Sequence, residues 1–438
     1  MSLLIIVISC LLPIALAIRS PKSLIYYLLY TGALPFGMLF GDDVFTPFGR
    51  LNILSLRVLG LIMGCSFVLM VNFNKFMPYW RKWILWALFL LWCAASILWS
   101  ENYIYGLRMF SKVCAPLIFA GAVIVTNPQE SDFKIVEGAI FWNLIVLAII
   151  AVVCKFLGIV SFKGALTVPS HGPAVLAAFL MIPVALASAK IVCGQQRIKW
   201  TFVWLVAVAC AVGAYARTPL AAEAVGILAI IFCCLPVILR IPFVLLFSFL
   251  TTATFLASDY LRHRMFYKNA DITLVKLISD PKYVFDHLDT SGRSTLWNML
   301  LKKFYEPDPI LGSGLGATES YLHGLESAST AKAVHSEYIR LVCETGLVGL
   351  LLFVFAGLVT IFTIYISIDK MPAGLKHIGL TSLALILSYF IFCGSDNAIN
   401  YVNVQAIYIC YYAAIATCLI QRNDNKSLYV NAAEKSAV

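Results

Sequence analysis

Residues 259–335 read DYLRHRMFYKNADITLVKLISDPKYVFDHLDTSGRSTLWNMLLKKFYEPDPILGSGLGATESYLHGLESASTAKAVH, the only long polar segment of the chain. Apolar runs of about 20 residues lie on both sides of it, and each is long enough to cross a bilayer as a helix. The 438 residues are 61% hydrophobic and 12% charged, whereas soluble domains carry about 25% charged residues. The sequence therefore predicts an all-α polytopic membrane protein, because a β-barrel would show short alternating segments instead.

The apolar runs predict about 12–13 transmembrane helices and one large external loop that carries short helices. The expected spans lie near residues 2–18, 23–40, 51–72, 83–99, 112–126, 135–159, 172–192, 200–216, 218–238, 241–258, 341–367, 377–394 and 402–420. The expected organisation is transmembrane helices in 1–258, the loop in 259–335, transmembrane helices in 336–421 and a cytoplasmic tail in 422–438.

The formal net charge of +10 does not come from the polar segment, because residues 259–335 hold nine Lys/Arg and nine Asp/Glu. The basic excess lies in short turns between spans, such as Arg19/Lys22 and Lys370/Lys376. Basic turns are typical of the cytoplasmic side, so the polar segment is expected to face outward. The pattern also excludes nucleic acid as a partner, because no basic stripe is interleaved with aromatic residues.

The thirteen cysteines lie in or beside apolar spans and form no CxxC motif. We expect them to pack as small apolar residues, without a disulfide framework or a zinc site. The pair Asp42 and Asp43 raises the alternative of a metal site, but two adjacent carboxylates are more typical of a solvated turn. The sequence therefore predicts no bound metal.

Arg217 is the first candidate functional residue. It lies in Tyr215-Ala216-Arg217-Thr218-Pro219, where the proline is expected to end one helix and open the next on the outer side. A charged residue inside or at the end of a span is a functional candidate by default. An arginine at a helix break beneath an external loop can bind an anionic head group.

Arg293 lies in the loop, in the motif Ser291-Gly292-Arg293-Ser294-Thr295. The glycine predicts a turn, and the following residues predict the start of a helix. A guanidinium there can bind an anion together with the amides of the helix N-terminus. The alternative is a surface salt bridge with Asp289.

Gly312, Gly314 and Gly316 form a cluster that is not a dinucleotide-binding motif, because no buried strand precedes it. It predicts a tight turn that lets the backbone approach a ligand or another helix. Farther along, His335 precedes Glu337 by two residues, a spacing that suits a base and the carboxylate that orients it. The alternative for His335 is an interfacial residue that caps a helix.

In this order, these motifs resemble the O-antigen ligase and polysaccharide polymerase family of bacterial inner membranes. The similarity runs from Arg217 to about Gly349, and Ile97-Leu98-Trp99-Ser100-Glu101 resembles the segment before the family's first external loop. The resemblance implies an undecaprenyl-diphosphate-linked oligosaccharide as donor and a glycan or lipid A–core as acceptor. It implies that Arg217 and Arg293 bind the donor diphosphate and that His335 activates the acceptor hydroxyl.

The chemistry suits these residue types. When a sugar hydroxyl attacks an anomeric carbon, negative charge grows on the leaving diphosphate, and two arginines can stabilise it. A histidine can take the hydroxyl proton at neutral pH. We therefore expect a metal-independent glycosyltransferase without a cofactor, and we expect Glu337 and the three glycines to help bind the substrate.

Within this family we favour a repeat-unit polymerase of O-antigen or exopolysaccharide, and the alternative is the ligase that transfers the glycan to lipid A–core. A second alternative is a polysaccharide transporter or flippase, but such proteins show internal repeats with broken helices at mid-membrane, and the sequence has no such symmetry. Further expected partners are membrane lipids and other polysaccharide-export proteins.

Overall fold

The computed structural model describes residues 7–34, 43–46, 49–158, 165–168, 172–257, 279–280, 282–283, 293–325 and 333–436. Helices dominate these residues, which confirms the predicted all-α polytopic membrane protein. The exception among them is a short antiparallel hairpin of β1 (Asp43–Thr46) and β2 (Gly49–Asn52). Most of the predicted loop 259–335 lies outside the described residues, whereas its segment 293–325 is described.

The helices follow one another along the chain with short connections. They are η1 (Val7–Leu11), α2 (Leu12–Arg19), α3 (Pro21–Gly32), α5 (Ile53–Val71), α6 (Phe73–Phe76), η2 (Met77–Tyr79), α7 (Trp80–Ser96), η3 (Ile97–Trp99), α8 (Tyr103–Val125), α9 (Glu130–Phe156), α10 (Pro173–Val192), α11 (Arg197–Gly213), α12 (Arg217–Cys234), α13 (Val237–Ala257), α17 (Arg293–Leu300), η4 (Leu301–Tyr305), α18 (Ala317–Gly324), α19 (Glu337–Ser367), η5 (Ile368–Lys370), η6 (Ala373–Leu375), α20 (Lys376–Cys393), η7 (Ala398–Tyr401), η8 (Val402–Ala406) and α21 (Ile407–Ser436).

Within the described ranges, eight helices are long and apolar enough to cross a membrane, and three shorter apolar helices accompany them. The predicted number of 12–13 spans is therefore higher than length and composition support. The clearest difference is near the N-terminus, where Ser20 has extended backbone and Pro21 opens a new helix. The 12 residues of α3 rise about 18 Å, which is less than the roughly 30 Å of a bilayer core.

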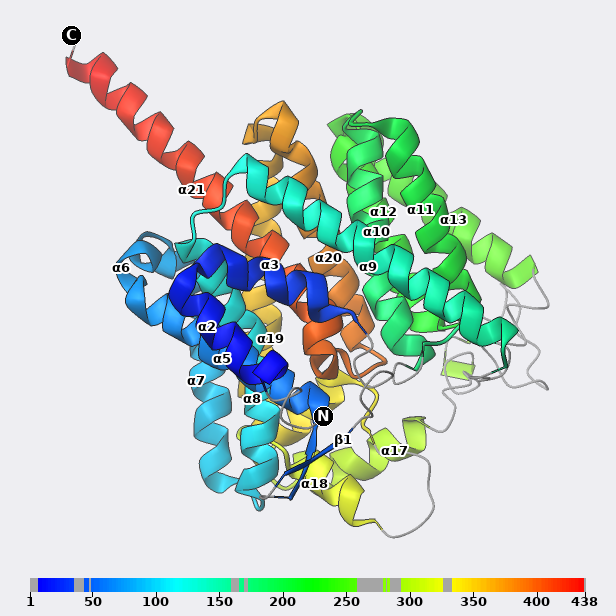
Figure 1. Cartoon of the computed structure of the whole chain (residues 1–438). Helices are drawn as coiled ribbons and strands as arrows, with labels where there is room; N and C mark the ends of the chain where they lie inside the picture. Colours follow the sequence, from blue (N-terminus) through cyan, green and yellow to red (C-terminus); the bar gives the residue numbers. More distant parts are fainter. Residues whose placement is uncertain are drawn as a thin grey trace.

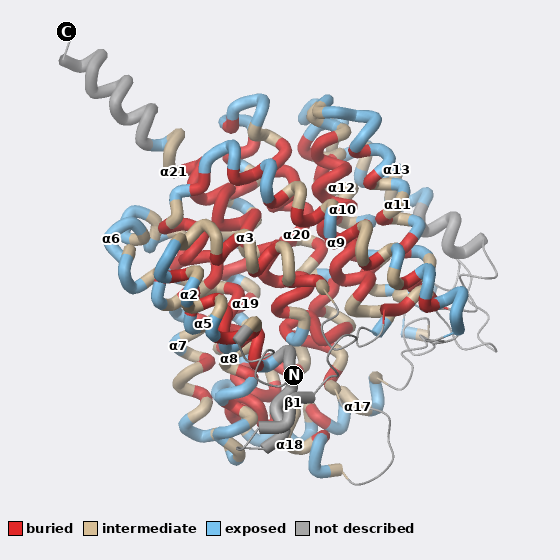
Figure 2. Tube along the Cα trace, viewed as in Figure 1, coloured by how far each residue is buried: buried red, intermediate tan, exposed pale blue. Residues whose placement is uncertain are grey.

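The two ends of the helical bundle differ in character. The elements α17 and α18 lie at one end, and the turns that join α10 to α11 and α19 to α20 lie at the opposite end (Figure 1). The most buried segments run through the middle of the bundle, where α20 packs against α10 and α12 (Figure 2). The last helix, α21, extends beyond the bundle through most of the predicted tail 422–438.

The helix α19 is broken at Gly346, whose φ of 64° and ψ of −171° are not helical. A helix break leaves backbone groups without their usual partners, and such groups are costly when buried. Residues 309–314 satisfy several of them. The amides of Ser313 and Gly314 donate to the carbonyls of Cys343 and Glu344, at 2.9 Å each, and the Leu347 amide donates to the carbonyl of Pro309, also at 2.9 Å. The polar segment is thereby fixed to a membrane helix.

Candidate functional site

The turn 394–397, between α20 and η7, is where three distant parts of the chain meet. Arg293, the first residue of α17, donates from Nη1 to the carbonyl oxygen of Ser395 at 2.5 Å. The hydroxyls of Thr218 and Ser395 lie 2.6 Å apart. Arg217 precedes Thr218 and opens α12, so the turn places both predicted arginines at one end of the bundle.

His335 reaches the same turn from the other side. Its backbone N–H donates to Asn397 Oδ1 at 2.9 Å, and its Nδ1 lies 3.2 Å from Asn397 Nδ2. His335 Nδ1 is also 4.0 Å from Asp396 Oδ1. The preceding residue, Val334, accepts a hydrogen bond of 2.8 Å from Trp297 of α17. The helix that carries Arg293 is thus tied directly to the segment that carries His335.

Asp396 is the carboxylate nearest to His335 among the ion pairs of the described chain. It is 6% exposed. Its Oδ1 accepts a hydrogen bond from the Asn397 backbone at 2.7 Å and one from the Tyr401 hydroxyl at 3.1 Å. Both donors favour the ionised form of the carboxyl group and fix its direction. The turn therefore holds a negative charge close to the imidazole.

Glu337 lies beside this site but is fully buried. Its carboxylate pairs with Arg340, one turn along α19, and its Oε1 accepts the backbone N–H of Ile399 at 2.8 Å. These contacts join the start of α19 to η7, directly after the 394–397 turn. They give Glu337 a structural role, while its predicted contact with substrate stays a prediction.

The three predicted glycines bring the polar segment against two membrane helices. Gly312, Gly314 and Gly316 all have left-handed φ values, of 71°, 91° and 85°. A side chain at Gly314 would place its Cβ 2.6 Å from the amide nitrogen of Ser100, and one at Gly316 would place it 2.8 Å from the carbonyl oxygen of Tyr105. The described contacts of these glycines are with helices, which is one of the two roles that the sequence predicts.

Glu344 anchors the other side of this glycine segment. Its buried carboxylate accepts the backbone N–H of Gly316 at 2.9 Å, the backbone N–H of Thr318 at 3.3 Å and the Thr318 hydroxyl. Because α18 begins at Ala317, these donors are the free amides and the side chain of a helix N-terminus, where a carboxylate is favourable. This contact holds α18 against α19.

The segment 97–101, which carries part of the family resemblance, docks on the same glycine segment. Trp99 Nε1 donates to the carbonyl oxygen of Gly312 at 3.2 Å, and the Ser100 hydroxyl donates to that of Leu315 at 2.9 Å. Two motifs that lie more than 200 residues apart in the sequence are therefore one structural unit.

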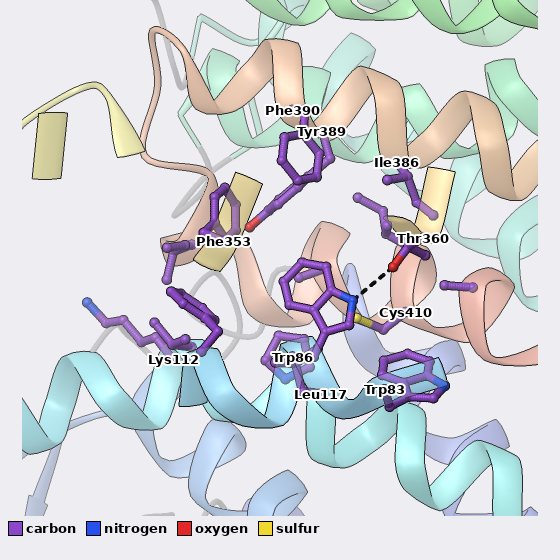
Figure 3. A pocket seen from close by; sticks show the side chains of 17 residues that line it. Trp83, Trp86, Lys112, Leu117, Phe353, Thr360, Ile386, Tyr389, Phe390 and Cys410 are labelled. Atoms are coloured by element: carbon purple, nitrogen blue, oxygen red, sulfur yellow. Dashed lines mark hydrogen bonds between the residues drawn. The ribbon is translucent and has the colours of Figure 1, made fainter. Parts of the chain in front are cut away.

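An apolar cavity lies among the membrane helices next to this end of the bundle. Figure 3 shows Lys112 and Trp83 toward opposite ends of its lining, with Trp86 between them and bonded to Thr360. The lining comes from α7, α8, α19, α20, η7, η8 and α21, and it is almost wholly apolar. Lys112 links the cavity to the turn region, because its Nζ donates to Asn400 Oδ1 at 2.8 Å.

The sequence-predicted residues thus fall into two groups. The contacts of the 394–397 turn bring Arg217, Arg293 and His335 to one place, whereas Glu337 and the glycines lie in the packing around it. Sequence reasoning missed Ser395, Asp396 and Asn397. A signal was present, because this run of polar residues follows an apolar span at the end predicted to face outward.

Comparison with protein families gives one match. A family model described as O-antigen ligase matches residues 138–354, which include Arg217, Arg293 and His335. A search of curated proteins found no match. The 394–397 turn lies C-terminal to the matched residues.

Proposed function

Because the chain belongs, through residues 138–354, to the O-antigen ligase family, we propose that it is a metal-independent glycosyltransferase of the bacterial inner membrane that polymerises surface polysaccharide. The observation that carries this proposal is the 394–397 turn, which joins the helix ends of Arg217 and Arg293 to His335. Two guanidinium groups and an imidazole at one site suit the transfer of a sugar from a diphosphate.

The donor is an undecaprenyl-diphosphate-linked oligosaccharide. Arg217 and Arg293 bind its diphosphate, since forked guanidinium donors fit phosphate oxygens and each arginine lies at the start of a helix. As the bond between the anomeric carbon and the diphosphate breaks, the electron pair stays on the phosphate oxygen. The two arginines then stabilise a charge that is larger than in the ground state, which accelerates the reaction.

His335 takes the proton of the acceptor hydroxyl while the oxygen of that hydroxyl attacks the anomeric carbon. The proton goes to Nε2, and the ring becomes an imidazolium. Asp396, at 4.0 Å from Nδ1, stabilises that positive charge. Glu337 and the glycines Gly312, Gly314 and Gly316 support the site by fixing the elements around it.

The apolar cavity is the proposed site of the lipid carrier's hydrocarbon chain. It lies within the membrane helices, and its lining includes Ile399, two residues after Asn397. A chain held there would end close to the turn that carries the reacting groups. An apolar chain in an apolar cavity is stabilised by about 25 cal/mol for each Å2 removed from water.

The site is proposed to face the periplasm. The basic turns at 192–197 and 367–376 lie at the end of the bundle opposite to α17 and α18 (Figure 1). Basic turns stay on the cytoplasmic side, so this arrangement supports an outward-facing site. It also suits a donor whose glycan is assembled into a polymer outside the cytoplasm.

The test of the reaction is turnover of a lipid-linked oligosaccharide by purified protein. Wild type is expected to release undecaprenyl diphosphate and lengthen the glycan, and His335→Ala is expected to insert in the membrane normally but to lose transfer. Movement of the lipid across vesicles without any glycosyl transfer would instead establish the transporter alternative. Near-normal transfer by His335→Ala would remove His335 as the base.

The alternative within the family is ligation of the finished glycan to lipid A–core, and glycan analysis of a deletion strain separates it from polymerisation. Loss of the polymerase leaves single repeat units on the carrier. Full-length chains that accumulate on the carrier, and are missing from lipid A, would refute the polymerase and establish the ligase.

A further inference from the structure

Asn397 holds His335 at two points. Its Oδ1 accepts the backbone N–H of His335, at 2.9 Å, and its Nδ2 lies 3.2 Å from the ring nitrogen Nδ1. His335 has a φ of 55°, in the left-handed region that is unfavourable for residues other than glycine. The backbone bond to Asn397 helps to stabilise this conformation, and the second bond fixes the ring.

The backbone bond decides which way the Asn397 amide faces. A backbone N–H can only donate, so the amide oxygen must face it and the NH2 group must face the ring. The NH2 group also can only donate, so Nδ1 of His335 must accept through its lone pair. In the neutral ring the proton is then on Nε2.

This tautomer is the wrong one for the proposed reaction. A base that acts at Nε2 needs its lone pair there, and the ring proton must then be on Nδ1. A protonated Nδ1 can donate to a carboxylate but not to an amide NH2 group. Asp396 is placed for that role, but at 4.0 Å its Oδ1 is beyond hydrogen-bond distance in this arrangement.

We propose that Asn397 is a positioning residue that keeps His335 in a resting tautomer with the proton on Nε2, and that Asp396 takes over Nδ1 in the reacting state. The inference rests on the glycosyltransferase function proposed above. It assigns opposite roles to two adjacent side chains of one turn. The amide holds the base inactive, and the carboxylate makes it competent.

The exchange between the two states is balanced by water alone. The His335 side chain is 35% exposed, so water can donate a proton to Nδ1 and accept one from Nε2. The other ionisable groups at the turn are Tyr401, whose hydroxyl donates to Asp396, and Arg293, which donates to the carbonyl of Ser395. Neither of these two contacts involves Nδ1, so the competition for it is between Asn397 and Asp396.

The resting tautomer can be read directly by 15N NMR of the full chain, labelled at its six histidines and held in detergent micelles. At a pH of about 8.5 an ordinary imidazole is neutral. The signals that disappear in His335→Gln belong to His335. They are expected to show a protonated Nε2 and an unprotonated Nδ1, and a protonated Nδ1 in the wild type would overturn the inference. This arm needs no variant of Asn397 to fold.

Asn397→Asp tests the cause, because a carboxylate still accepts the backbone N–H but cannot donate to the ring. The proton of His335 is expected to move to Nδ1. Asn400→Asp is the matched control, since it adds the same charge three residues along, where the side chain already faces Lys112. The control is expected to keep the wild-type tautomer, and an unchanged tautomer in Asn397→Asp would overturn the inference.

The pH profile of kcat separates this inference from the proposed function. In Asn397→Asp the added carboxylate favours the imidazolium, so the rising limb of the profile is expected to move to higher pH. Transfer that requires His335 but has the same pH profile in both proteins would overturn the inference and leave the proposed function intact. Because the NMR needs no substrate, a reversed tautomer in Asn397→Asp supports the role of Asn397 even if glycosyl transfer is not detected.

Discussion

Asp396→Asn is expected to slow the proposed chemical step without weakening donor binding. The substitution keeps the shape of the side chain. An amide oxygen can still accept the backbone N–H of Asn397 and the hydroxyl of Tyr401, which bond to Asp396 Oδ1 at 2.7 Å and 3.1 Å. What the substitution removes is the negative charge that faces the imidazolium of His335.

The size of the effect follows from the distance between the two groups. Two unit charges at the observed 4.0 Å interact by about 1 kcal/mol in water and by about 4 kcal/mol at an effective dielectric constant of 20. Asp396 is 6% exposed and the His335 side chain 35% exposed, so the interaction lies between these limits. The corresponding loss of kcat is about fivefold to about a thousandfold.

The assay is steady-state transfer from a lipid-linked oligosaccharide by purified protein, with kcat and the donor KM measured separately. The donor KM is expected to change little, because Arg293 bonds to the carbonyl of Ser395 and not to the Asp396 side chain. Asp369→Asn is the control, since Asp369 is exposed at the opposite end of the bundle and pairs with Lys376. A wild-type kcat in Asp396→Asn, or an effect confined to KM, would refute the role of Asp396.

Three further perturbations test other parts of the site. Arg217→Lys is expected to raise the donor KM and lower kcat, because a point charge does not replace a bidentate fork, and normal kinetics would remove its diphosphate role. Glu344→Leu is expected to lower the free energy of unfolding by roughly 3–6 kcal/mol, because the Gly316 and Thr318 donors lose their acceptor, at about 1–3 kcal/mol for each unsatisfied group. Thermal unfolding in detergent measures this, with the partly exposed Glu101→Leu as control, and equal stability of the two variants would contradict it. Ala406→Phe fills the apolar cavity and is expected to raise KM for a donor with a full-length lipid but not for a donor with a short one; the same rise for both donors would exclude the lipid chain from the cavity.

The class of the protein followed from composition alone. Long apolar runs with few charges can be stable only where the backbone satisfies its own hydrogen bonds, and a chain of this composition does so as membrane helices. The candidates Arg217, Arg293 and His335 were also accessible from the sequence, because charged or titratable residues at helix ends beside apolar spans are costly and need a reason. Their proposed roles came from the family resemblance.

The number of spans and the composition of the site depended on the tertiary structure. Ser20 and Pro21 divide an apolar region into two short helices, which a count of apolar residues does not reveal. Gly312, Gly314 and Gly316 were expected at a ligand, whereas their described neighbours are helices α8 and α19 and the segment before α8.

The long-range pairs show the physical reason most directly. Arg293 and Ser395 are 102 residues apart, and His335 and Asn397 are 62 apart. Local sequence determines that each of these residues lies near the end of a helix, because helix ends follow from proline, glycine and polar capping residues. Which helix ends meet depends on how α12, α17, α19 and α20 pack, and that packing is set by many apolar contacts distributed over the whole chain. Only the folded structure therefore brings Asp396 and Asn397 to His335.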